Sequence, residues 1–81
     1  MSISNKLKYY RKKNNITQTD LAKRAGVSRQ SIYAVEAQKS EPSLELAFRL
    51  SSILNVNITE LFIWSVEDKE GNSTIPPFSI F

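Results

Sequence analysis

The sequence predicts an all-α domain of five helices, followed by a short C-terminal β-hairpin or extended tail. Three observations indicate this fold class. Apolar residues recur at helical spacing through about residue 62, residues that can cap a helix precede the helical segments, and Gly26 and Pro42 stand where segments must end. We assign residues 1–62 to the helical domain and residues 63–81 to a C-terminal extension that can contribute a β-strand.

Most of the helical segments are marked by a residue that can begin them. The expected N-caps, in chain order, are Ser4 or Asn5, Thr17, Ser28 and Ser43, and a short final helix is expected to begin near Thr59. Thr17 is followed three residues later by Asp20, an arrangement similar to a capping box. Gly26 is typical of a residue that ends a helix in the left-handed conformation, and Pro42 forbids continuation of the third segment.

The length and composition exclude several classes of protein. A chain of 81 residues forms one domain with a modest core. Because it contains no cysteine and no histidine, we expect no disulfide, no metal site and no cofactor. With no glycine-rich phosphate loop and no clustered carboxylates either, an enzyme is nearly excluded. The apolar runs are too short for a membrane span and the N-terminus is too polar for a signal peptide, so we expect no membrane partner and a cytoplasmic location.

The formal net charge of +3 conceals an uneven distribution. Residues 1–40 carry nine bases and two acids, a net charge of +7, whereas residues 41–81 carry two bases and six acids, a net charge of −4. This polarity favours a polyanion as the partner of the first half. A solvated basic face without a partner is the alternative interpretation.

Residues 18–37 predict two short helices that cross steeply around Gly26. Such a turn needs a small residue where the backbones approach, a positive φ, an apolar plug after it, and apolar inward positions on both helices. Seven residues meet these needs: Leu21, Ala22, Ala25, Gly26, Val27, Ile32 and Val35. Together with the basic charge they indicate a helix-turn-helix whose partner is double-stranded DNA. An ordinary helical hairpin in a non-binding bundle is the less favoured alternative.

The second helix of this motif presents a polar face. If Ile32 and Val35 point inward, Gln30 and Tyr33 lie on the opposite face, with Arg29 on its flank. Arginine can bind guanine O6 and N7 through two donors, and glutamine can pair with adenine N6 and N7. We therefore expect Arg29 and Gln30 to read bases, and Tyr33 to contact a phosphate or a thymine methyl group.

Phosphate contacts are expected on both sides of that helix. Thr17 and Gln18 lie at the start of the preceding helix, where free N–H groups favour anions. Lys39 and Ser40 follow the recognition helix and are placed to reach the other side of the groove.

Arg11 and Glu36 lie on or beside the apolar faces of the first and third helical segments. A charge without a partner in such a place is costly. We therefore infer a partly buried ion pair that fixes how the recognition helix sits on the rest of the domain.

Over residues 7–62, the chain resembles the lambdoid phage repressor and Cro type of domain, also called the xenobiotic-response-element family, and its small Gram-positive regulators. The match is carried by the motif ITQTDLAKRAGVSRQSIYAVEAQKSEPSLELAFRL. The resemblance implies a five-helix fold, a phosphate contact from Gln18, and an ion pair between Arg11 and Glu36. The groove-facing positions that it implies are Ser28, Arg29, Gln30, Tyr33 and Ala34. One departure is Ala37-Gln38, where relatives commonly have Asn-Gly, and it leaves the shape of the following loop open.

Residues 63–81 contain two apolar runs about a polar turn that includes Gly71-Asn72. This pattern favours a hairpin, although Pro76-Pro77 confines the second run to an edge or to extended structure. In the regulators that this chain resembles, a short strand after the last helix pairs with the start of the chain, and this region joins two subunits. We therefore expect a homodimer interface formed or bordered by Phe62, Ile63, Trp64, Phe78 and Phe81. A tail without a role in assembly is the alternative.

These patterns together predict a sequence-specific transcriptional regulator, namely a repressor that binds a palindromic operator as a homodimer, with half-sites about one helical turn apart. The alternative is an antitoxin, or the controller of a restriction–modification system, whose tail holds a protein partner. No small-molecule ligand is expected, because the chain is too short for a separate ligand domain.

Overall fold

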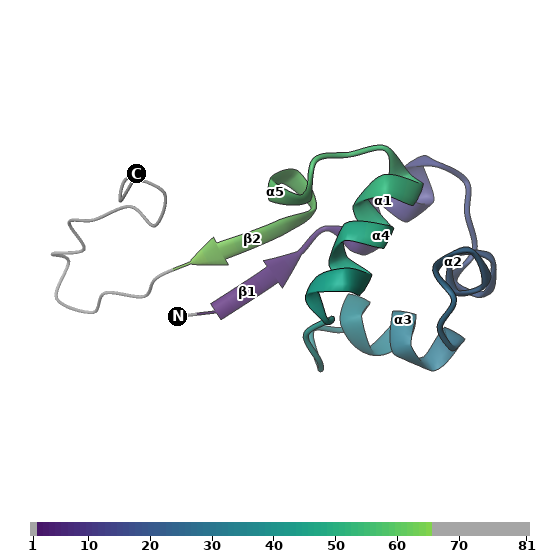
Figure 1. The fold of residues 1–81 in the computed structure, drawn as a ribbon, viewed down its shortest axis with the longest axis horizontal. Coiled ribbons are helices and arrows are strands. Elements are labelled where there is room, and N and C mark those ends of the chain that lie inside the picture. The colour runs from purple at the N-terminus through teal and green to yellow at the C-terminus, as the bar shows by residue number, and fades with distance from the viewer. Residues whose placement is uncertain (1, 66–81) are drawn as a thin grey trace, which may run out of the picture.

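The computed structural model describes residues 2–65, whose elements are arranged as Figure 1 shows. Within this range, five helices pack together and two short strands leave them as a narrow arm. In chain order the elements are β1 (Ser2–Asn5), α1 (Leu7–Lys13), α2 (Gln18–Ala25), α3 (Arg29–Glu36), α4 (Leu44–Leu54), α5 (Ile58–Leu61) and β2 (Phe62–Ser65). The predicted five-helix fold is confirmed.

Three of the predicted N-caps form as expected. The hydroxyls of Thr17, Ser28 and Ser43 each accept a hydrogen bond from the backbone N–H three residues later, at 3.0, 3.1 and 3.1 Å. Each cap satisfies one of the donors that a helix start leaves unpaired. Asp20 does not complete the expected capping box, because its carboxylate pairs with Arg24 at 3.1 Å, one turn along the same helix.

The start of the chain differs from the prediction, because residues 2–5 form strand β1 where the first helix was expected to begin. Helix α1 has Lys6 as its N-cap, with no side-chain cap bond from that residue. The predicted cap residue Asn5 nevertheless acts on α1, since its Oδ1 accepts a hydrogen bond from the Leu7 N–H at 3.0 Å. The last helix begins at Ile58, in agreement with the expected start near Thr59.

The arm is an antiparallel pair in which Asn5 lies opposite Phe62 and Ile3 lies opposite Trp64. The predicted pairing of a strand after the last helix with the start of the chain is thus confirmed. Because side chains alternate along a strand, these four residues share one face of the arm, and Ile63 lies on the other. A hairpin was also predicted about Gly71-Asn72. Its turn, its second apolar run, Phe78 and Phe81 all lie outside the described residues.

The core lies where the apolar faces of the five helices meet. Its buried residues are Leu7, Ile16, Leu21, Ala22, Ala25, Ile32, Val35, Leu50, Leu54 and Leu61. Every inward position predicted for the helical pair is among them, and Val27 packs against this cluster. Gly26 adopts φ +73°, which allows the Val27 N–H to donate to the Ala22 carbonyl oxygen at 3.0 Å. None of the helices in residues 2–65 is long and apolar enough to cross a membrane.

Candidate nucleic-acid interface

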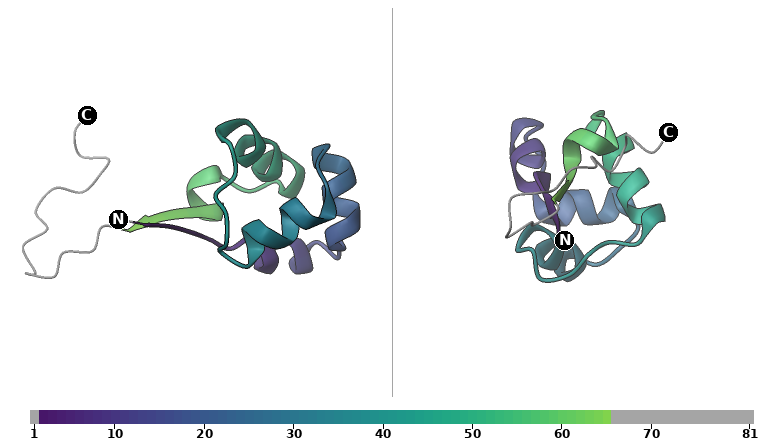
Figure 2. Two further views of the ribbon diagram at one scale, coloured as in Figure 1. Left: turned by 90° about the horizontal axis from the view of Figure 1, so that it is seen from below. Right: turned by 90° about the vertical axis from the view of Figure 1, so that its left-hand side faces the viewer.

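Helix α3 lies at the surface of the helical body. In the left panel of Figure 2 it is at the front, with no other described element drawn across it. Ile32 and Val35 are buried beneath it, so the opposite face is open. Arg29 and Gln30 are exposed in its first turn, and Tyr33 is 48% exposed one turn later. The face predicted to read bases is therefore accessible over two turns.

The predicted contact residues gather around α3 and the start of α2. Seven of them are exposed, namely Thr17, Ser28, Arg29, Gln30, Tyr33, Lys39 and Ser40, and two are half-buried, Gln18 and Ala34. Ser28 also has a structural role, because its hydroxyl caps α3 and lies 3.0 Å from the Ser31 hydroxyl. A groove contact from Ser28 would therefore share its hydroxyl with the helix cap.

The four arginines differ in whether they form an ion pair. In residues 2–65, which include all four arginines, Arg11, Arg24 and Arg49 each form an ion pair with a carboxylate of the fold. Arg29 forms none with any carboxylate in that range, and it is exposed at the N-terminal end of α3. None of the hydrogen bonds within residues 2–65 uses the five donors of its guanidinium.

The loop after α3 has a defined shape although it contains Ala37-Gln38 in place of the Asn-Gly common in relatives. Gln38 adopts φ +62°, the left-handed conformation that glycine takes readily. The loop then closes on the end of the helix, because the N–H groups of Lys39 and Ser40 donate to the Ala34 carbonyl oxygen at 2.9 and 3.3 Å. The loop thus has a left-handed residue without a glycine.

Lys39 lies beside the exposed face of α3. Its Nζ is 5.9 Å from the centroid of the Tyr33 ring, close enough for a cation–π interaction. The contact places a positive charge next to the C-terminal part of the predicted reading face.

The predicted ion pair between Arg11 and Glu36 is present. Arg11 Nε donates to Glu36 Oε2 at 2.6 Å and its second terminal nitrogen donates to Oε1 at 3.2 Å, a bidentate arrangement. The two side chains are only 10% and 4% exposed. Arg11 also donates to the Ile16 carbonyl oxygen at 2.8 Å, so that one guanidinium joins α1, the following turn and the end of α3.

Gln18 also bonds to Glu36, a contact that the sequence analysis did not predict. Its Nε2 donates to Glu36 Oε1 at 3.0 Å. This bond orients the amide at the first position of α2, and it leaves one N–H of the amide and the backbone N–H groups of the helix start for an anion. Nothing in the spacing of residues 18 and 36 indicates the contact, because it depends on how α2 and α3 cross.

Replacing Gln18 with alanine is expected to weaken binding to every DNA sequence by a similar factor of about ten, because contacts to phosphate carry little sequence information. Fluorescence anisotropy with a specific and a random duplex measures both affinities. Thr19→Ala is the matched control, since Thr19 is the exposed neighbour on α2. A loss confined to the specific duplex would contradict the phosphate role.

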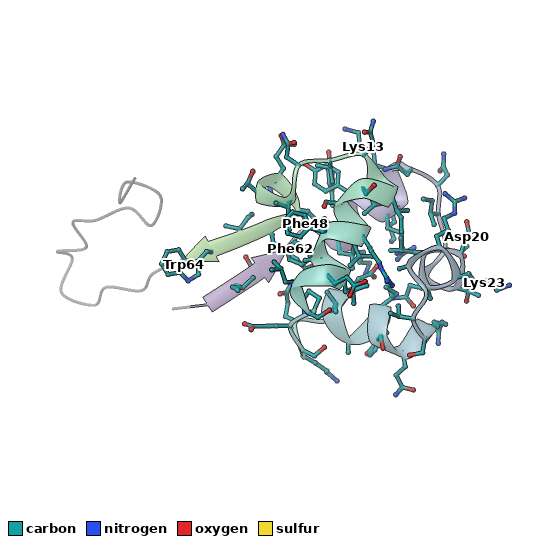
Figure 3. The ribbon with its side chains drawn as sticks, in the orientation of Figure 1. Lys13, Asp20, Lys23, Phe48, Phe62 and Trp64 are labelled. Carbon is teal, nitrogen blue, oxygen red and sulfur yellow. The ribbon has the colours of Figure 1, made fainter. Side chains whose placement is uncertain are left out.

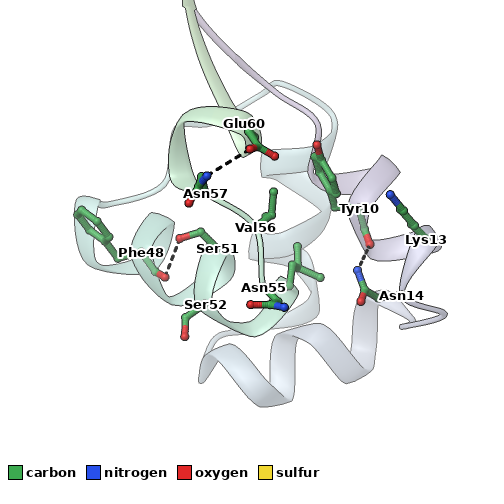
Figure 4. Close-up of a pocket in the computed structure, with 11 residues that line it drawn as sticks. Tyr10, Lys13, Asn14, Phe48, Ser51, Ser52, Asn55, Val56, Asn57 and Glu60 are labelled. Atoms are coloured by element: carbon green, nitrogen blue, oxygen red, sulfur yellow. Dashed lines mark hydrogen bonds between the residues drawn. The ribbon is translucent and has the colours of Figure 1, made fainter. Parts of the chain in front are cut away.

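A wide hollow of about 770 Å³ lies elsewhere, between α1, α4 and the turn before α5 (Figure 4). Its polar side chains bond locally: Asn14 Nδ2 donates to the Tyr10 carbonyl oxygen at 2.7 Å, and Asn57 Nδ2 donates to Glu60 at 3.2 Å. It contains none of the predicted DNA-contacting residues, and we assign it no part in the interface.

Comparison with known proteins identifies the family and several relatives. Residues 7–61 match the model of the helix-turn-helix family. A transcriptional regulator of the helix-turn-helix type from Methanocaldococcus jannaschii is 53% identical over 68 residues, which are 84% of this chain and all of that relative. One from Archaeoglobus fulgidus is 41% identical over 63 residues, 78% of this chain and 89% of the relative. A third, from Methanothermobacter thermautotrophicus, is 41% identical over 58 residues, 70% of this chain and 84% of the relative.

These relatives come from archaea, whereas the resemblance seen in the sequence pointed to Gram-positive regulators within the same family. The matched region begins with α1 and ends with α5, and so contains the complete helical body described above. The chain therefore belongs to the helix-turn-helix family of DNA-binding regulators.

Proposed function

We propose that this protein is a sequence-specific repressor that binds a palindromic operator as a homodimer. The observation that carries the proposal is the exposed, unpaired Arg29 beside Gln30 in the first turn of α3, in a described structure where the other arginines are paired. In a helix-turn-helix, the N-terminal residues of the recognition helix are those that reach base edges. Gln18 and Lys39 flank that turn and are suited to contact phosphates.

The homodimer part of the proposal rests on the exposed apolar surface of the arm. Ile3 is 44% and Trp64 is 43% exposed on its apolar face, and Figure 3 shows Trp64 out on β2, beyond the helical body. Next to them, a groove of about 280 Å³ is lined by residues that include Phe62, Pro42 and Leu44, the last of which is 72% exposed. Apolar surface gathered in this way is typical of a protein interface.

A second copy of the chain is the occupant that we propose for this surface. A twofold dimer presents two identical recognition helices, which match the two halves of a palindrome. Phe62 and Trp64 lie on this surface and are proposed to form the interface. Ile63, on the other face of the arm, is proposed to border it, and Phe78 and Phe81 of the extension are proposed to form or border it.

Sedimentation of a Trp64→Ser variant tests the homodimer. The parent is expected to sediment as a dimer, and the variant is expected to shift towards the monomer because a large apolar contact is removed. Phe48→Ser is the matched control, since Phe48 is a similarly exposed aromatic residue (55%) that lies on α4 and outside the groove. A chain ending at Glu67 tests whether the extension contributes to the dimer. If this shortened chain still sediments as a dimer, Phe78 and Phe81 have no role in dimerisation.

Selection of duplexes from random DNA with the parent protein tests the operator. Two inverted copies of one half-site, with centres about one helical turn apart, are the expected result. A consensus without inverted symmetry would contradict the palindrome.

A further inference from the structure

Gln38 is held in a conformation that its side chain disfavours. Its φ of +62° is left-handed, a region in which a Cβ approaches the following carbonyl oxygen. Such a residue persists when its surroundings over-determine it. The contacts of the Gln38 side chain indicate what holds it there.

The side chain of Gln38 reaches across to β1. Its Nε2 donates to the Asn5 carbonyl oxygen at 3.3 Å, and Asn5 Nδ2 donates in return to Gln38 Oε1 at 3.4 Å. The same Asn5 Nδ2 donates to the Val35 carbonyl oxygen, in the last turn of α3, at 2.8 Å. These three bonds, which we call the Asn5–Gln38 clasp, join residues 30 and 33 positions apart.

Asn5 also belongs to the arm and to the start of α1. It lies opposite Phe62 in the β1–β2 pair, and its Oδ1 accepts the hydrogen bond that begins α1. Lys6 N–H donates to the Leu61 carbonyl oxygen at 2.9 Å, where the two strands meet the helical body. The clasp therefore joins the base of the arm to the C-terminal end of the recognition helix.

We propose that the Asn5–Gln38 clasp sets the angle between the arm and α3, and thereby the spacing of half-sites that the homodimer accepts. The inference rests on the proposed function, in which the arms join two copies. Figure 1 shows the arm extending away from the helical body, so that a small rotation at its base moves the partner's recognition helix by a large distance. Asn5 and Gln38 are positioning residues, because they touch no DNA and act only on where α3 lies relative to the arm.

Two variants remove the clasp in different ways. Gln38→Gly deletes the side chain and keeps the left-handed backbone, which glycine adopts without strain. Asn5→Asp keeps an oxygen to accept from the Leu7 N–H, but it loses the donors to Val35 and Gln38. Asn55→Gly is the matched control, since Asn55 ends α4 at φ +55° and forms none of the clasp bonds.

The probe is a set of synthetic duplexes that carry the half-site selected from random DNA by the parent. One duplex has a single half-site, one has the preferred spacing of two inverted half-sites, and two have that spacing changed by one base pair either way. We expect both clasp variants to bind the single half-site as the parent does. Their preference for the selected spacing is expected to fall by about threefold or more, and that of Asn55→Gly to stay unchanged.

Any other result would overturn the proposal that the clasp sets the spacing. A folded Gln38→Gly and a folded Asn5→Asp with the parent's spacing profile would show that the clasp sets no angle. Equal losses on the single half-site and on every spacing would assign it to local support of α3. A relaxed profile in Asn55→Gly would show that the change in spacing preference is not specific to the clasp. A parent without any spacing preference would instead overturn the homodimer proposal, and the clasp with it, so the two failures are distinguishable.

Discussion

Replacing Arg11 with methionine is expected to lower the free energy of unfolding by about 3–5 kcal/mol. The substitution leaves the Glu36 carboxylate, only 4% exposed, without its cation, and the Ile16 carbonyl oxygen without its donor. Gln18 would remain as the partner of that carboxylate, and one neutral amide does not compensate for a lost guanidinium. Urea denaturation followed by circular dichroism measures the change.

The exposed pair of Arg24 and Asp20 provides the control for that measurement. Its side chains are 52% and 46% exposed, and Arg24→Met is expected to cost less than about 1 kcal/mol. A double variant in which Arg11 and Glu36 both become apolar should recover much of the loss, because no buried charge is left unpaired. Similar small effects of Arg11→Met and Arg24→Met would show that the buried pair does not hold the recognition helix.

Replacing Arg29 with alanine is expected to weaken binding to the operator by about 1–3 kcal/mol and to relax discrimination at one base position. The physical reason is that a guanidinium can make two hydrogen bonds to guanine, and the other three bases do not offer the same pair of acceptors. Gln30→Ala is expected to have a similar effect at a neighbouring position. Affinities for a panel of duplexes, each with one base pair of the half-site changed, provide the measurement.

Arg24→Ala is the matched control for Arg29→Ala. It removes the same charge from an exposed site on α2, where the guanidinium already pairs with Asp20. A small and uniform loss across the panel is expected, because a distant charge attracts all DNA alike. If Arg29→Ala and Gln30→Ala both bind the operator as the parent does, the assignment of α3 as the recognition helix is wrong.

Features whose partners lie within one helical turn could be predicted. Thr17, Ser28 and Ser43 cap helices through the N–H three residues later, and Gly26 ends α2 at a positive φ. The pair of Arg11 and Glu36, 25 residues apart, could also be inferred, because a charge on an apolar helix face needs a partner and each stood on such a face.

Other features depend on partners that no local pattern indicates. Residues 2–5 are strand only because they pair with residues 62–65, some 60 positions away. An isolated strand of four residues leaves its backbone donors and acceptors unpaired, so its conformation follows from its partner. Asp20 likewise had two possible partners within one turn, and the packed helix favours Arg24 over the capping box.

The sequence by itself determined the helices, the turn at Gly26, the buried ion pair and the exposed face that carries Arg29 and Gln30. The reason is that helical periodicity, capping and the cost of an unpaired buried charge act over short ranges or on single residues. Only the tertiary structure decided that Gln18 joins the network at Glu36. It also confirmed that the arm forms from the two ends of residues 2–65, a pairing that the family resemblance implied and that no local pattern of residues 2–5 indicates. It alone also joined Asn5 to Gln38, because a hydrogen bond across 33 residues exists only after the helices have packed.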